Sequence, residues 1–212
     1  MALIRELTYG GEYANCYIIG EEGSPCLVID PATNKRGCLD DYIERRHAGK
    51  CLGFLITHGH FDHIGGLVDL KHMAPVFMSE EDIACLGDPC LNGSEAFDLP
   101  VPVRVKGIEP YPVEDEDEIR LGPFVLTVIA TPFHTAGSVC YYLKADRAVF
   151  TGDALFHLSV GRTDLPGGCP RFQRDSLRKL LLLPDDTKVF PGHGASTTIR
   201  QERFANPELQ GL

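Results

Sequence analysis

Three histidines and an aspartate lie within the six residues 58–63. The segment follows an apolar run that is typical of a buried strand, and loops at strand ends often carry functional side chains. His58 and His60 are two residues apart, so their side chains point the same way in extended backbone. Asp62 and His63 follow in the predicted turn into a helix. Because imidazole and carboxylate groups bind zinc, iron and manganese, this cluster predicts a metal site.

Three later apolar runs each end at one further potential ligand beside glycine or proline: His134, Asp153 and His193. A single zinc ion with an open position needs only three protein ligands. Seven ligands therefore imply two metal ions about 3.5–4 Å apart, with a hydroxide between them. The predicted division is His58, His60 and His134 on one ion, Asp62, His63 and His193 on the other, and Asp153 as the bridge.

This pattern resembles the metallo-β-lactamase superfamily, whose members share H-x-H-x-D-H and three later single ligands in this order. Within it, the chain resembles the glyoxalase II (hydroxyacylglutathione hydrolase) branch. Residues 131–138 are similar to its T-P-x-H-T-x-G motif, residues 151–156 to its G-D-x-L-F motif, and residues 159–168 to short bacterial glyoxalase II-like proteins. The resemblance implies an α/β fold, a four-layer αββα sandwich with the metals at one edge of the sheets. It also implies two divalent ions, for which zinc is expected and iron or manganese are acceptable.

The activity that this resemblance implies is hydrolysis of a small-molecule thioester. A hydroxide bridging the two metals would attack the carbonyl, a metal would stabilise the oxyanion, and the thiolate would leave. Asp62 and Asp153 are the expected catalytic carboxylates, Asp62 also as a proton acceptor. Thr57 and Asp30 are candidates for orienting the ligands. For Asp30, which precedes Pro31, a cap of the turn is an equally good interpretation.

Substrate recognition departs from the glyoxalase II pattern. Those enzymes carry a C-terminal helical domain that helps to hold glutathione, and the residues after His193 are too few for it. Arg162 occupies the position of a family lysine, while Asp164 and Ala195 occupy positions of family tyrosines. Arg162 can still bind a carboxylate through two hydrogen bonds, and Tyr142 is a candidate for the floor of the cleft. The acyl group and the thiol carrier stay open.

A persulfide dioxygenase is the main alternative, because such relatives share H-x-H-x-D-H and a G-R-T-D-like segment. They bind one iron ion through the first group of ligands, but the context of residues 155–160 favours the hydrolase. A β-lactamase is disfavoured because that branch uses a cysteine as a ligand of the second metal. A metal-stabilised binding module is disfavoured because open metal positions are normally reactive.

The composition indicates the number of domains and excludes some classes of binding partner. The 212 residues are 43% hydrophobic and 24% charged, which is typical of one globular domain over residues 1–212. A formal net charge of −10 opposes binding to nucleic acid and anionic membranes. The sequence has no spanning apolar run and no signal-peptide pattern, so a cytoplasmic location and eight reduced cysteines are expected. The oligomeric state is left open.

Strand and helix patterns alternate along the chain, which indicates a layered α/β domain. Helices are predicted over residues 37–49, 64–73, 80–86 and 172–183. Strands are predicted over residues 15–19, 26–30, 51–57, 75–79, 119–121, 124–130, 139–143, 148–151 and 188–190.

Overall fold

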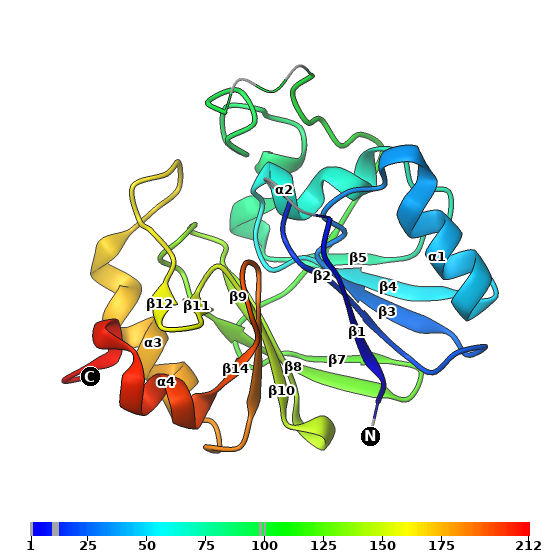
Figure 1. Ribbon diagram of the computed structural model, residues 1–212. Coiled ribbons are helices and arrows are strands. Elements are labelled where there is room, and N and C mark those ends of the chain that lie inside the picture. The colour runs from blue at the N-terminus through cyan, green and yellow to red at the C-terminus, as the bar shows by residue number, and fades with distance from the viewer. Residues whose placement is uncertain (1, 10–12, 98, 100) are drawn as a thin grey trace.

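A computed structural model describes residues 2–9, 13–97, 99 and 101–212, and most of its strands form two six-stranded sheets (Figure 1). The first sheet comes from the N-terminal half, and its strands lie in chain order. They are β1 (Ile4–Leu7), β2 (Cys16–Ile19), β3 (Cys26–Ile29), β4 (Cys51–Leu55), β5 (Val76–Met78) and β6 (Tyr111–Pro112). Strands β3 to β6 run parallel, so their carboxyl ends meet at one edge of the sheet.

The second sheet comes from the C-terminal half, and a separate hairpin of β11 (Leu155–Phe156) and β12 (Ser159–Val160) accompanies it. Strands β10 and β13 run parallel at its centre, while the other neighbouring strands are antiparallel. The order across the sheet is β14 (Thr197–Thr198), β13 (Lys188–Pro191), β10 (Ala148–Gly152), β9 (Val139–Leu143), β8 (Phe124–Ala130) and β7 (Glu118–Leu121).

Helices cover the outer faces of both sheets, which gives the four αββα layers that were predicted (Figure 1). One buried cluster joins Leu39 and Ile43 to the first sheet, a second fills the space between the sheets, and a third joins Leu177 and Leu180 to the second sheet. The helices are α1 (Cys38–His47), α2 (Phe61–Ile64), α3 (Gln173–Leu181) and α4 (Ile199–Ala205). Short 3₁₀ helices span Lys35–Gly37, Gly65–Val68, Glu80–Leu86, Lys144–Asp146, Pro170–Phe172 and Pro207–Leu209.

The charge pattern of α1 explains where this helix begins and ends. Asp40 and Asp41 lie in its first turn, and Arg45, Arg46 and His47 lie in its last turn. Acidic groups near the N-terminus and basic groups near the C-terminus oppose the helix dipole and stabilise the helix. Ala48 then adopts a left-handed backbone with φ of 52°, which ends the helix as a C-cap.

The helix that was predicted over residues 64–73 is wrong: a 3₁₀ turn ends at Val68, and bends follow. The buried carboxylate of Asp40 accepts hydrogen bonds from the backbone nitrogens of Lys71 and His72, at 3.0 and 3.1 Å. Gly66 also donates its backbone N–H to the carbonyl of Pro31, at 2.6 Å. These tertiary bonds take backbone groups that a continuing helix would use.

Most other predicted elements match the structure within a few residues. The segment 80–86 is a 3₁₀ helix rather than an α-helix, and strand β1 and helix α4 were not predicted. All eight cysteines are free, as expected. Within the described part of the chain, no helix combines the length and the hydropathy that crossing a membrane requires.

Candidate metal centre

The ends of four strands bring the seven predicted ligands to one edge of the two sheets. Strand β4 leads into the segment with His58 and His60, and β8 leads to His134. Strand β10 is followed at once by Asp153, and β13 leads to His193. Backbone bonds between the halves fix this edge, including one from Val139 N to the carbonyl of Thr57, at 2.8 Å.

The first group of side chains is buried and consists of His58, His60 and His134. His60 Nδ1 lies 3.1 Å from His58 Nε2 and 2.9 Å from His134 Nε2. His134 Nδ1 donates to the carbonyl oxygen of Arg162, at 2.8 Å, so its Nε2 carries no proton. Each hydrogen bond between two ring nitrogens needs one proton, and three nitrogens this close together cannot all pair in that way. Their lone pairs instead suit a bound cation.

The tautomer of His58 is fixed in the same way, through Thr57 and Asp30. The Thr57 hydroxyl donates to Asp30 Oδ2, at 2.7 Å, and it accepts from His58 Nδ1, at 3.1 Å. His58 Nε2 is therefore also left without a proton. Asp30 accepts from the Thr57 backbone and from His63 Nδ1 as well, both at 2.8 Å. This geometry favours the orienting role of Asp30 over the turn cap.

The second group consists of Asp62, His63 and His193. Asp62 Oδ2 lies 3.0 Å from His193 Nε2, and the buried His63 Nε2 has no hydrogen-bond partner among the described residues. The side chain of Asp153 lies between the two groups: its Oδ1 is 3.3 Å from His63 Nε2, and its Oδ2 is 3.5 Å from His134 Nε2. Asp153 Oδ1 is also buried without a hydrogen-bond partner.

The pKa values differ between the two groups because their neighbours differ. Burial, followed by repulsion from neighbouring imidazoles, lowers the pKa of His60 to about 4 and holds that of His58 well below its usual value. Burial also opposes a charge on His63, but the carboxylates of Asp62, Asp30 and Asp153 outweigh it and raise its pKa well above the usual range. His58 and His60 thus meet as neutral imidazoles, while three carboxylates, those of Asp62, Asp30 and Asp153, lie around His63.

The structure brings the seven side chains together in three close groups: two have the members of the predicted division, and a third joins His58, His63 and Asp153. Buried nitrogen and oxygen atoms that have no partner are costly in a protein interior unless something binds them. His60 Nε2, His63 Nε2 and Asp153 Oδ1 are three such atoms, and all belong to the predicted ligands. His58, His60 and His134 could hold one ion, and Asp62, His63 and His193 the second, with Asp153 shared.

A family profile described as the metallo-beta-lactamase superfamily matches residues 9–193. The chain belongs to this superfamily. Its membership and the names of its relatives support a metal-dependent hydrolase. The "Probable metallo-hydrolase YqgX" of Bacillus subtilis is 36% identical and covers 98% of both chains. The "Hydroxyacylglutathione hydrolase GloC" of Haemophilus influenzae is 32% identical over 92% of both chains.

Two solved structures of similar proteins cover nearly the whole chain of this superfamily member, and each is 33% identical to it. The BLEG-1 B3 metallo-beta-lactamase superposes with a TM-score of 0.91 over 99% of this chain and 100% of its own. TTHA1623, solved in a di-iron-bound form, superposes with a TM-score of 0.81 over 97% of this chain and 100% of its own. The second of these shows that a protein with this fold can hold two metal ions.

Asp82 joins the two loops that carry the first group of candidate ligands in this superfamily member, and its role was not predicted. Its buried carboxylate accepts hydrogen bonds from Gly59 N and Thr135 Oγ1, both at 2.7 Å, and from Gly137 N, at 2.9 Å. Gly59 lies between two ligand histidines, and Thr135 follows His134. In the sequence, Asp82 follows two glutamates and is typical of the exposed start of a helix, so no local signal marks it.

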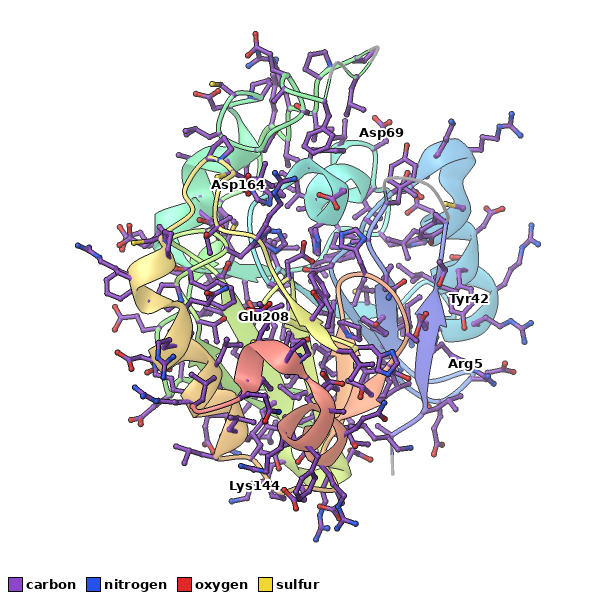
Figure 2. All side chains as sticks on the ribbon, turned by 60° about the vertical axis from the view of Figure 1, so that its left-hand side comes forward. Arg5, Tyr42, Asp69, Lys144, Asp164 and Glu208 are labelled. Atoms are coloured by element: carbon purple, nitrogen blue, oxygen red, sulfur yellow. The ribbon has the colours of Figure 1, made fainter. Side chains whose placement is uncertain are left out.

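A cavity of about 460 Å³ opens over the ligands, and Arg162 lines it. The Arg162 guanidinium forms two bonds to the Asp164 carboxylate, at 2.6 and 2.7 Å. Figure 2 shows Asp164 in the upper half of the molecule and Lys144 near its lower end. A second hollow, of about 780 Å³, lies beside Lys144 and contains none of the seven ligands. The cavity over the ligands is therefore the candidate substrate site.

Tyr142 is not among the described residues that line this cavity, so the prediction that it forms the cleft floor is wrong. Neighbouring residues of β9 face opposite sides of the sheet. Tyr141 therefore packs between the sheets, whereas Tyr142 belongs to the buried cluster that includes Leu177 and Leu180 of α3. The sequence alone does not tell which of the two adjacent tyrosines faces which side.

The position of Tyr142 leads to a testable expectation. A Tyr142→Phe variant should keep kcat/KM within about twofold of the parent protein, because the substitution is conservative and Tyr142 is not among the residues that line the cavity. Steady-state kinetics of the two proteins, loaded with the same metal, would check this. A tenfold loss of kcat/KM without a change in thermal stability would restore Tyr142 as a substrate contact.

Proposed function

We propose that this protein hydrolyses a small thioester, as the glyoxalase II enzymes that it resembles do, with two divalent ions as cofactors. The observation that carries the proposal is the convergence of all seven ligand side chains in two groups, with Asp153 between them, under an open cavity. The 32% identity with a protein named hydroxyacylglutathione hydrolase supports this choice of substrate class. Zinc is the proposed metal, since imidazole and carboxylate ligands suit it, although they accept iron and manganese too.

Individual residues of the chain would have separate roles in the proposed hydrolysis. When bound, two divalent ions would lower the pKa of a water molecule and stabilise negative charge on the substrate carbonyl oxygen. Asp62 lines the cavity, and its carboxylate would accept a proton from the attacking water. Thr57, Asp30 and the Arg162 carbonyl hold the imidazole rings in the tautomer that presents a lone pair inward. A thiolate is a good leaving group and needs little protonation.

Metal content and thioester turnover, measured together, test this proposal. Protein produced without added metal would be analysed by plasma emission spectrometry and assayed with lactoylglutathione and with a simple acyl thioester. We expect about two metal ions per chain, consistent with a two-metal site, and hydrolysis of at least one thioester. No thioester turnover by protein that carries two metals per chain would refute the proposal.

The persulfide dioxygenase is the second candidate, and the number of bound metal ions separates it from the hydrolase. One iron ion would need only one group of ligands, whereas two ions would also use Asp62, His63 and His193. One iron per chain, with oxygen uptake on a persulfide and no thioester turnover, would reverse the order. Because one similar protein is named a B3 metallo-beta-lactamase, a chromogenic β-lactam belongs in the same assays. Faster turnover of the β-lactam than of any thioester would make β-lactam hydrolysis the preferred function.

A further inference from the structure

The walls of the cavity over the ligands are apolar, and from them we propose that the substrate is a thioester with an apolar acyl chain rather than a glutathione thioester with a small polar acyl group. This inference rests on the proposed thioesterase function and narrows its substrate class. The acyl chain would lie in the cavity, while the thiol carrier would extend through the mouth into solvent.

Aromatic and aliphatic side chains line this cavity. Phe61 and Phe97 line it with their ring centroids 5.4 Å apart, and Phe156, Val160 and Leu165 line it as well. The ring of Phe156 lies edge-on to that of His193, with centroids 6.2 Å apart. The apolar wall therefore begins directly beside the ligands, where the reacting carbonyl group would lie.

The polar side chains of the cavity wall, apart from the candidate ligands, already have hydrogen-bond partners within the protein. Apart from the candidate metal ligands, Asn92 and Arg162 are the polar side chains among the described lining residues. Asn92 Nδ2 donates to the carbonyls of Cys85 and Val103, and its Oδ1 accepts from Ser94 N. Asn92 is fully buried and both N–H groups of its Nδ2 are donated within the protein, so its side chain is not exposed to the amide groups of a peptide-like carrier.

Charge gives a second argument against glutathione, which carries two carboxylates and one ammonium group. Arg162 is the one Lys or Arg side chain among the described residues that line the cavity. Asp164 holds the Arg162 guanidinium with two short bonds. Only the Nη1 edge of the guanidinium is left for a substrate carboxylate, which the Asp164 carboxylate would repel, whereas an apolar chain has no such cost.

The exposure of Phe97 at the cavity also supports an apolar acyl chain. Its side chain is 46% exposed, whereas Phe61, against which it packs, is 6% exposed. An exposed aromatic ring at the edge of an apolar cavity gains stability when a ligand covers it. The exposed face of Phe97 is therefore the surface that a longer acyl chain would cover.

A series of acyl thioesters of one small neutral thiol, N-acetylcysteamine, tests the inference on the metal-loaded protein. From acetyl to hexanoyl, kcat/KM should rise about two- to fourfold for each added methylene group, because burying one CH₂ corresponds to about a fourfold gain. Hexanoyl thioester should also be turned over faster than lactoylglutathione. A kcat/KM that does not change with chain length, or a preference for lactoylglutathione, would overturn the inference.

Two phenylalanine variants locate the effect in the structure. Phe97→Ala should reduce the gain per methylene to less than twofold, whereas Phe204→Ala should retain it. Phe204 is a matched control, since it is 75% exposed on α4 and does not line the cavity. The same slope in both variants would overturn the assignment. Turnover without dependence on chain length would refute only this inference, whereas no turnover of any thioester by metal-loaded protein would refute the proposed function as well.

Discussion

Replacement of Asp153 by alanine should remove at least one metal ion per chain and lower kcat/KM by more than about 100-fold. Loss of groups that merely orient metal ligands already costs about 10–100-fold in affinity or activity, and a shared ligand should cost more. Asp153 Oδ1 and Oδ2 lie 3.3 Å from His63 Nε2 and 3.5 Å from His134 Nε2, so its removal takes away a carboxylate that lies beside both groups. Plasma emission spectrometry and steady-state kinetics on the same preparation would measure both effects.

Asp175→Ala is a matched control for this substitution. Asp175 lies on α3 with a side chain that is 76% exposed, and it pairs with Arg178 on the same helix. Exposed pairs of this kind contribute about 0–1 kcal/mol to stability, so metal content and kcat/KM should stay unchanged in this variant. If Asp153→Ala also kept the full metal content, its role as a shared ligand would be refuted, whatever happened to its activity.

The order and the grouping of the ligands could be predicted because each signal is local in the sequence. An apolar run that stops at a histidine or an aspartate marks a strand end, and four such ends meet at one edge once the strands pair. Asp153 shows this most clearly, because it directly follows β10. The strands were also predicted well, since the buried strands β3 and β10 are almost wholly apolar.

Features that depend on contacts between distant segments could not be predicted. The helix over residues 64–73 is interrupted because Asp40, in a different helix, takes the N–H groups of Lys71 and His72. Tyr142 was misplaced because the face of a strand residue depends on register against other strands. Asp82 was missed for the same reason, as its partners lie 23 to 55 residues away.

Asp82→Ala should weaken metal binding by about 10–100-fold, because Asp82 positions ligands without touching them. Its carboxylate joins the loop with Gly59 to the loop with Thr135 and Gly137, and without it the ring of His134 would no longer be held against those of the first loop. The variant should also lose stability, by about 2–5 kcal/mol, because buried donors are left without partners. Chelator competition and chemical denaturation would measure the two effects separately.

Asp40→Ala separates positioning of the ligands from general stabilisation. Asp40 is also buried, and its carboxylate accepts three bonds, from Asn34 Nδ2 and from the backbone of Lys71 and His72. It bonds to none of the segments that carry the candidate ligands, so its loss should lower the free energy of unfolding by a similar amount, about 2–5 kcal/mol. Its metal affinity should nevertheless stay within about threefold of the parent protein, because the ligand geometry is kept. Equal metal affinities in the two variants would show that Asp82 stabilises the fold only, whereas a tenfold difference at matched stability would establish it as the residue that aligns the two ligand loops.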